Sequence, residues 1–292
     1  QGKTNQAIYY CRKALSINPD YADAYYNLGN FLRDKGEKEN AFLNYKKAIL
    51  LDRNHMFSYY NMGFVVNHVK KEEVDRDLYD IILNMLDSKL LIRPIDIADL
   101  VLRALSIDNI LLYDKNDIDF DKAVTLFAES ELFLKFIKLA PIPNLKIEKL
   151  LKRIRKGLLL NENPKNTQNV LILQSALAIH CFTNEYIYNE DDIEKKELKR
   201  LERSIAHILS NKEKQPSPHA ILSLASYKSL NQFKWCGKLK SNKYIEEVIK
   251  RQISEPLYEN KIKSKIISID KIRDTVSSQV RQQYEEYPYP RW

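Results

Sequence analysis

Glycine is scarce in this chain, and its scarcity limits the kinds of site that the chain can contain. Six glycines occur among 292 residues. They lie too far apart to form the phosphate-cradling loop of a P-loop or of a dinucleotide-binding turn, which needs several glycines within a few residues. The sequence therefore excludes an ordinary nucleotide or S-adenosylmethionine site of the α/β kind, and we expect no cofactor in this chain.

Cysteines and long apolar runs are scarce as well. The three cysteines, Cys11, Cys181 and Cys236, lie far apart and form no Cys-x-x-Cys pair. This usage is typical of a reduced, cytoplasmic setting, and we expect no metal site. No apolar run reaches the ~18 residues that span a bilayer, and no signal peptide is visible. We therefore expect a cytoplasmic protein without a membrane partner.

The charge balance is positive but does not point to one partner. The formal net charge is +8, and charged residues make up 29% of the chain. Lysine is mixed with glutamate along the expected helices, which is typical of solvated helix faces. Residues 195–265 carry a local excess of lysine and arginine. That stretch has no RNA- or DNA-binding motif, so we do not expect a nucleic-acid partner.

A repeat with a period of 34 residues organises the first part of the chain. Small residues at fixed places in successive helices allow the helices to approach closely, and larger ones would cost about 1–3 kcal/mol each by overpacking. Gly36 lies between two such helices and predicts the turn that joins them. The period is typical of a helix–turn–helix solenoid. The residues that recur are Tyr25, Asn27, Leu28 and Gly29 as Tyr59, Asn61, Met62 and Gly63, with Ala7 and Ala14 as Ala41 and Ala48.

These residues resemble the tetratricopeptide repeat (TPR) family. Pro19 closes one repeat, as the family pattern expects, whereas Arg53 stands where the next closing proline would be. The resemblance implies that the first helix of each repeat lines a concave groove for a protein or peptide partner. Carboxamides there can pair with both the N–H and the C=O groups of an extended peptide, or they can bond only to neighbouring helices. The expected groove residues are Tyr26, Asn27, Asn30, Tyr60 and Asn61.

Helical periodicity continues beyond the repeats, and we expect an all-α protein. Residues 72–90 predict an amphipathic helix that is either a degenerate repeat or a cap of the solenoid. Residues 170–188 form the most apolar expected helix, which we place in the centre of the C-terminal block. Short helices are expected at 243–251 and 258–267. The expected domains are TPR repeats in 1–90, the first one truncated, a larger α-helical domain in 91–270, and a linker helix with a tail in 271–292.

A histidine and a glutamate near the end of the most apolar helix form a candidate acid–base pair. His180 and Glu185 are close in the sequence, and polar groups beside a buried helix are costly unless they are hydrogen-bonded. Nothing else in the sequence completes a catalytic site. We therefore favour a structural hydrogen-bond network over catalysis and assign no catalytic residue.

The end of the chain carries a second resemblance. A Val-Arg-x-Gln-Tyr-Glu helix followed by Pro-Tyr-Pro-Arg-Trp is similar to the segment just before the catalytic domain of bacterial TPR-containing, S-adenosylmethionine-dependent methyltransferases. Residues 176–188 are similar to another stretch of that family. The resemblance implies a fragment cut at both ends, which begins inside a repeat and lacks the domain that would bind S-adenosylmethionine. The residues that match are Asn184, Glu185, Tyr186, Arg281, Tyr284, Pro288, Tyr289, Pro290 and Trp292.

Three functions follow as hypotheses. The first is the protein-interaction or substrate-recruiting region of a methyltransferase, which is not catalytic by itself. The second is a stand-alone TPR adaptor that binds a peptide in its concave groove. The third is the TPR region of a glycosyltransferase-like protein, because Asn27 and Asn61 resemble the asparagine ladder of O-linked N-acetylglucosamine transferase. The gene sequence that follows Trp292 would separate the first from the second.

Overall fold

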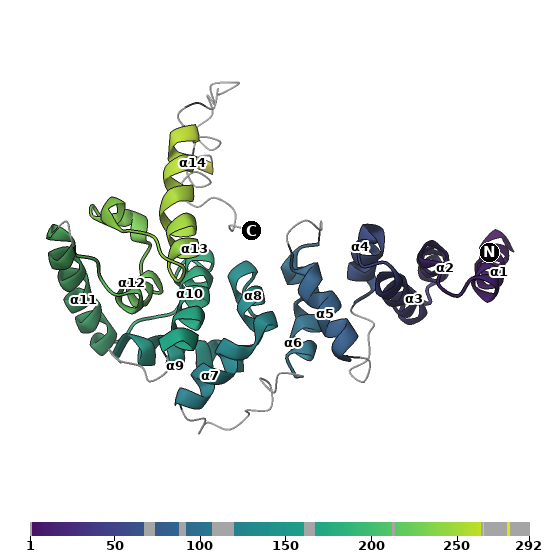
Figure 1. The fold of residues 1–292 in the computed structure, drawn as a ribbon, viewed down its shortest axis with the longest axis horizontal. Helices are drawn as coiled ribbons and strands as arrows, with labels where there is room; N and C mark the ends of the chain where they lie inside the picture. Colours follow the sequence, from purple (N-terminus) through teal and green to yellow (C-terminus); the bar gives the residue numbers. More distant parts are fainter. Residues whose placement is uncertain are drawn as a thin grey trace. The chain divides into compact units, whose positions relative to one another are not determined.

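The described part of the chain is helical throughout (Figure 1). A computed structural model describes residues 2–66, 74–87, 92–106, 120–160, 167–211, 214–263, 265 and 279–280. These residues are all-α and include no β-strand, which confirms the predicted fold class. Their contacts form two units, one of residues 1–118 with 130–136 and one of residues 119–129 with 137–292. The domain boundaries expected at residues 90 and 270 stay predictions.

The first unit begins with a row of four helices. Each helix packs against the next one, and the short turns between them reverse the chain, as Figure 1 shows. This is the helical-hairpin arrangement that the 34-residue period predicted. The helices are α1 (Gly2–Ile17), α2 (Ala22–Asp34), α3 (Lys38–Leu51) and α4 (Met56–Val65).

Close packing of α2 on α3 depends on one glycine. A Cβ added to Gly29 would lie 2.6 Å from Cε1 of Tyr45, whose ring is fully buried and has no room to move. The prediction of a close helix approach is confirmed at this position. It is wrong at Gly63, where an added Cβ would meet Ile92 at 3.5 Å, an ordinary van der Waals distance. The two glycines therefore recur in sequence without sharing a packing role.

The turn between α2 and α3 is a Schellman motif. Gly36 has a φ of +89°, in the left-handed region that favours glycine. Its N–H donates to the carbonyl of Arg33 at 2.9 Å, and the N–H of Glu37 donates to the carbonyl of Leu32 at 2.9 Å. The turn predicted at Gly36 is therefore confirmed.

Three further elements continue the first unit. The amphipathic helix expected within 72–90 is present as α5, and its apolar face is buried, with Leu78 and Ile82 fully so. Its N-cap residue, Asp75, accepts a hydrogen bond from the N–H of Leu78 at 2.8 Å and another from Lys46 of α3 at 2.6 Å. The three elements are α5 (Arg76–Met85), the 3₁₀ helix η3 (Pro94–Ile97) and α6 (Ala98–Ala104).

The second unit is built around α10 (Thr167–Thr183), against which α7, α9, α12 and α13 pack. Its central place confirms the sequence prediction, but the predicted end at residue 188 is wrong. Glu185 and Tyr186 have φ values of 53° and 57°, so the backbone turns left-handed directly after the helix. Other helices of this unit are α7 (Phe120–Glu129), α9 (Leu145–Leu160), α11 (Asp192–Ser210) and α12 (Pro218–Ala225). The helix α8 (Glu131–Leu139) has residues 131–136 in the first unit and residues 137–139 in the second.

The last helical run is continuous, and the prediction of two separate helices there is wrong. It consists of α13 (Glu246–Ile249), the π-helical turn η7 (Lys250–Ser254) and α14 (Glu255–Lys263). Pro256 has no N–H to donate, and its ring would meet the carbonyl of Gln252 in a regular α-helix. The wider π turn before the proline relieves this clash, so the helix continues through a residue that usually ends one.

Candidate functional site: the first-helix face of the repeats

The candidate site lies on one face of α2 and on the equivalent face of α4. Residues spaced three, four and seven apart share a helix face, and the two helices carry such residues at positions that are 34 apart. On α4 the four side chains are mostly aromatic, whereas on α2 they are mostly polar. The eight residues, which we call the first-helix face, are Asp23, Tyr26, Asn27 and Asn30 of α2 with Phe57, Tyr60, Asn61 and Phe64 of α4.

Two carboxamides join α2 to α4 at the centre of this face. Nδ2 of Asn61 donates to Oδ1 of Asn30 at 2.7 Å and to the hydroxyl oxygen of Tyr26 at 3.4 Å. Oδ1 of Asn30 also accepts from the hydroxyl of Tyr45 at 2.9 Å. Burial raises the pKa of Tyr45 to about 12, so this hydroxyl stays protonated and donates. The amide hydrogens of Asn30 and the amide oxygen of Asn61 have no partner among the described residues.

A histidine links the first turns of the same two helices. His55 is the N-cap residue of α4, and its Nδ1 accepts from the N–H of Ser58 at 3.2 Å. The proton is therefore on Nε2, which donates to Oδ1 of Asp23 at 3.2 Å. The His55 ring also lies against the ring of Tyr26, with centroids 5.0 Å apart. These contacts fix the register of α4 beside α2.

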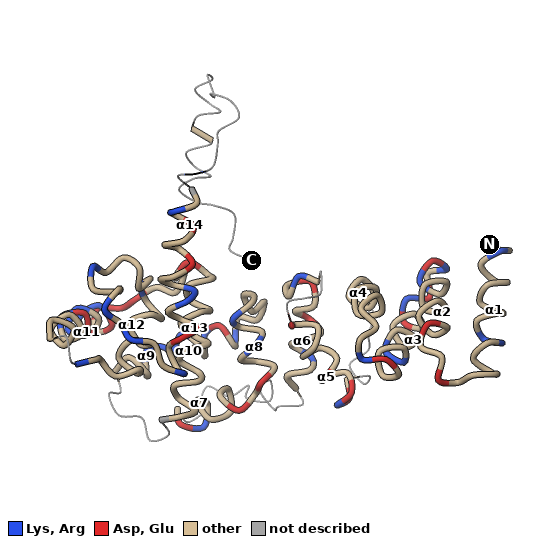
Figure 2. The backbone as a smooth tube through the Cα atoms, turned by 45° about the horizontal axis from the view of Figure 1, so that its top comes forward, with Lys and Arg blue, Asp and Glu red and all other residues tan. Residues whose placement is uncertain are grey.

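Exposed aromatic rings cover the α4 part of the face. Phe57 is 69% exposed, Tyr60 is 39% exposed and Phe64 is 61% exposed. The rings of Tyr60 and Phe64 meet edge to face at 4.8 Å, and the ring of Phe57 lies 6.3 Å from that of Tyr26. No residue of α4 is charged, and Figure 2 draws the whole helix in tan. The α4 part of the face is therefore neutral and aromatic, in a chain of which 29% is charged.

Comparison with known proteins identifies the repeats. One family model, described as TPR repeat, matches residues 1–32, and a second, described as Tetratricopeptide repeat, matches residues 22–55. Residues 1–55 are TPR repeats. No curated protein and no solved structure matches the chain. The helix α4 follows the matched residues directly and repeats residues of α2 at a spacing of 34.

The structure brings together some of the residues predicted for the TPR groove. Tyr26, Asn30 and Asn61 form one cluster, and Tyr60 lies beside it on α4. Asn27 is exposed and has no hydrogen bond to the described residues, whereas Asn61 is half-buried and bonds to α2. The two asparagines are thus equivalent in sequence but not in environment. Binding of a peptide by these five residues stays a prediction.

Sequence reasoning missed the rings that flank the cluster. Phe57 and Phe64 stand 34 residues after Asp23 and Asn30, so the repeat spacing alone would have placed them on the same TPR face. The repeat spacing did not point to Tyr45. Its contact with Asn30 depends on how α3 crosses α2, and spacing along one helix does not reveal that.

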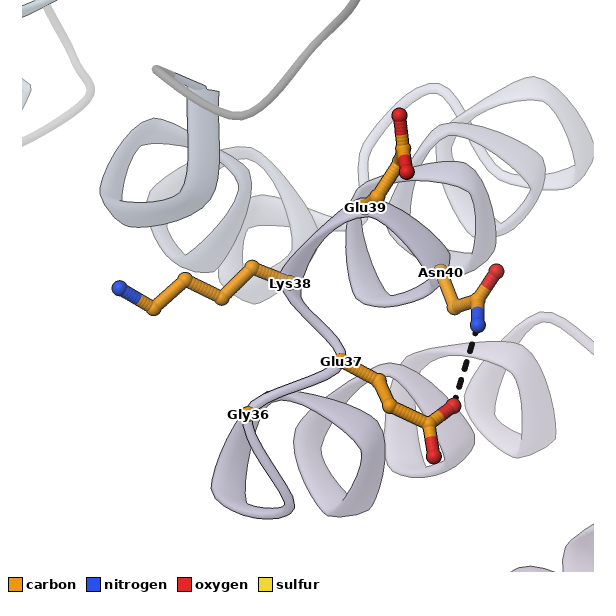
Figure 3. Close-up of a pocket in the computed structure, with 5 residues that line it drawn as sticks. All are labelled: Gly36, Glu37, Lys38, Glu39 and Asn40. Atoms are coloured by element: carbon orange, nitrogen blue, oxygen red, sulfur yellow. Dashed lines mark hydrogen bonds between the residues drawn. The ribbon is translucent and has the colours of Figure 1, made fainter.

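A shallow hollow lies at the turn inside the TPR hairpin but holds no convergent site (Figure 3). Nδ2 of Asn40 donates to Oε2 of Glu37 at 3.0 Å. Figure 3 shows Lys38 and Glu39 pointing away from Glu37 and from one another. Because these polar groups do not converge on a common point, we assign no ligand to this hollow.

A buried ion pair with an aromatic neighbour lies inside the second unit. Arg155 of α9 is 2% exposed, and its Nη2 lies 3.6 Å from Oε1 of Glu194, which is 1% exposed. The guanidinium stacks on the ring of Tyr227 at 3.9 Å, and the hydroxyl of Tyr227 donates to Glu194 at 2.6 Å. Burial raises the pKa of the nearby Cys181 thiol to about 12, which makes it a poor nucleophile. The cluster is closed to substrate, so its role is structural.

His180 belongs to a second buried network in the same unit. Its Nδ1–H donates to the carbonyl of Ile137 at 2.9 Å, and its Nε2 accepts from Nδ2 of Asn184 at 3.0 Å and lies 3.1 Å from the hydroxyl oxygen of Tyr188. Burial lowers the pKa of His180 to about 4, so the imidazole is neutral near pH 7, as this pattern requires. Glu185 is exposed and is not among its partners. The predicted structural network is confirmed.

The remaining predicted residues fall into two groups. Asn184, Glu185 and Tyr186 form the turn after α10, where the hydroxyl of Tyr186 donates to the carbonyl of Ala225 at 3.3 Å. Within the described ranges, no group of three His, Cys, Asp or Glu side chains is placed to hold a metal ion, and no helix there is long and apolar enough to cross a bilayer. The residues that lie outside the described ranges are Arg281, Tyr284, Pro288, Tyr289, Pro290 and Trp292.

Proposed function

We propose that the TPR repeats bind an extended segment of a partner protein along the first-helix face. Helical repeats of this type commonly present their inner surface to partner proteins. The observation that carries the proposal is the hydrogen-bonded pair of Asn30 and Asn61. Among the described residues, both amide hydrogens of Asn30 and the amide oxygen of Asn61 have no partner, while the other polar atoms of the pair are hydrogen-bonded within the protein. A peptide backbone presents the complementary groups at regular spacing.

Rigid support strengthens the proposal. Asn30 and Asn61 are hydrogen-bonded to each other across α2 and α4, and the hydroxyl of Tyr45 on α3 also donates to Asn30. Groups that are fixed before binding lose little conformational entropy when a ligand arrives, so more of the interaction free energy appears as affinity. Exposed rings on either side would bury their apolar surface against the side chains of the peptide.

The test uses peptides selected from a displayed random library against the full chain, with affinities measured by calorimetry. Asn61→Ala and Asn27→Ala should each weaken the selected peptide by about 0.5–1.5 kcal/mol. Asn27→Ala should change the melting temperature little, whereas Asn61→Ala should also lower it because it removes the hydrogen bonds to Asn30 and Tyr26. Asn44→Ala is the matched control, because Asn44 is half-buried on α3 and, among the described residues, bonds only to the backbone of its own helix. If the library yields no binder, or if Asn61→Ala binds as tightly as the wild type, the groove proposal is wrong.

A finer proposal is that this region recruits substrates for a methyltransferase. It rests on the resemblance of residues 176–188 and of the Pro-Tyr-Pro-Arg-Trp tail to that family. It predicts that the full-length natural protein has a mass above the 34.4 kDa of this chain and transfers methyl groups from S-adenosylmethionine. It further predicts that this chain alone gives no heat of binding with S-adenosylmethionine. If the natural protein has a mass of 34.4 kDa and transfers no methyl groups, the methyltransferase proposal fails and only the adaptor function remains.

A further inference from the structure

We infer that the partner segment is uncharged and rich in proline, and that it binds in the polyproline II conformation. This inference rests on the proposed function of the first-helix face and deepens it by naming the chemistry of the segment. Three features of the face carry it. They are the lack of charge on α4, the arrangement of its exposed rings, and the excess of donors at the carboxamide cluster.

The lack of charge on α4 disfavours partners that would bind this helix through ion pairs. Residues 54–69 contain no lysine, arginine, aspartate or glutamate, although charged residues make up 29% of the chain. The one acidic side chain of the first-helix face, Asp23, already accepts a hydrogen bond from His55. A charged peptide segment would lose its hydration here without gaining an opposite charge. The complementary segment is therefore neutral.

The exposed rings favour flat, rigid side chains. Phe57, Tyr60 and Phe64 follow one another along a single face of α4, and the last two meet edge to face at 4.8 Å. Aromatic rings of this kind form the walls of the grooves that bind proline-rich segments, because a pyrrolidine ring packs against them with little entropy left to lose. A polyproline II helix also keeps its shape without internal hydrogen bonds, so it is ordered before it binds.

The hydrogen-bond inventory favours a ligand that presents carbonyls. Oδ1 of Asn30 already accepts from Tyr45 and Asn61, and the hydroxyl oxygen of Tyr26 already accepts from Asn61. Three donor hydrogens remain among the described residues, namely both amide hydrogens of Asn30 and the hydroxyl hydrogen of Tyr26, against one acceptor, the amide oxygen of Asn61. Proline has a carbonyl and no N–H, and a polyproline II helix leaves its carbonyls open to solvent. A strand-forming peptide would instead bring one N–H for every carbonyl.

The experiment titrates the full chain with a capped peptide of about ten prolines and, separately, with a capped alanine–serine peptide of the same length. We expect saturable binding of the proline peptide with a Kd below about 1 mM, and much weaker binding of the other. Tyr60→Ala and Phe64→Ala should each weaken the proline peptide by about tenfold or more. Tyr10→Ala, which removes a 57% exposed ring of α1 outside the face, should leave the affinity unchanged.

Asn30→Asp tests the donor argument with almost no change of shape. The aspartate keeps an oxygen that can accept from Tyr45 and Asn61, but it has a second carboxylate oxygen in place of the NH₂ group. Both donors are therefore lost, and the proline peptide should bind about tenfold more weakly. Unchanged affinity would overturn the inference, as would tight binding of the alanine–serine peptide. If the proline peptide does not bind but library-selected peptides without proline do bind at this face, the inference fails and the proposed function stands. If nothing binds, both fail.

Discussion

The titration of His180 tests the polar interior of the second unit. Its hydrogen bonds favour the neutral imidazole, because Nδ1–H donates to the carbonyl of Ile137 while Nε2 accepts from the side-chain amide of Asn184. A proton on Nε2 would face the amide hydrogens of Asn184 and would place a charge where the side chain has no contact with solvent. Burial lowers the pKa of His180 from 6.5 to about 4, against a smaller opposing effect of the bond to Ile137.

The lowered pKa of His180 sets the sign and the size of the change in the free energy of unfolding with pH. From about pH 6.5 down to about pH 4, the unfolded chain binds a proton at this histidine while the folded chain does not. The free energy of unfolding therefore decreases as the pH falls through this range, and it is independent of this group above it. One pKa unit corresponds to about 1.4 kcal/mol, so the loss between pH 7 and pH 4 is about 3 kcal/mol.

The assay is urea unfolding at a series of pH values, followed by tryptophan fluorescence, to which Trp235 of the second unit contributes. His180→Gln removes the titrating group but keeps a donor and an acceptor, so the other titrating groups cancel in the comparison. The wild type should lose about 3 kcal/mol more than this variant between pH 7 and pH 4. His207→Gln, at an exposed position of α11, should behave like the wild type. Equal losses in wild type and His180→Gln would refute the buried neutral imidazole.

Three further predictions concern packing, charge and a helix end. Gly29→Ala should destabilise the first unit by about 1–3 kcal/mol through a clash with a buried tyrosine ring, whereas Gly63→Ala should stabilise it by up to about 1 kcal/mol; equal shifts in thermal unfolding would contradict the close helix approach. Arg155→Met should cost about 3–5 kcal/mol because it leaves Glu194 buried without its cation, and adding Glu194→Gln should restore part of the loss in urea unfolding. Asp191→Ala should cost about 1 kcal/mol in the same assay because it removes the capping box of α11, and a neutral result would show that the cap is dispensable.

The repeats could be predicted because their signals are local. The 34-residue period, the turn at Gly36 and the face shared by Tyr26 and Asn30 all follow from spacing along single helices. The capping signals at Asp191 and Ser217 are local as well: α11 begins directly after Asp191, and α12 begins at Pro218, directly after Ser217. Helix existence and helix face could therefore be read from the sequence.

The remaining features depend on contacts between distant residues. Gly63 carries the same sequence signal as Gly29, but only the neighbour at each position decides whether a glycine is needed. The partners of His180 come from positions 137 and 188, which spacing does not connect. The π turn before Pro256 is a backbone adjustment that proline alone does not predict, because proline more often ends a helix.

Photo-crosslinking tests the central claim, that the first-helix face of the TPR repeats is the protein-binding surface, most directly. A photoreactive phenylalanine analogue is placed at the position of Phe57 or, in a second variant, of Leu43, which is exposed on α3 and lies outside the face. Each variant is irradiated with a library-selected peptide, and the crosslink yield is measured by mass spectrometry. The account predicts a high yield from position 57 and background from position 43. Background from position 57, or a higher yield from position 43, would contradict it.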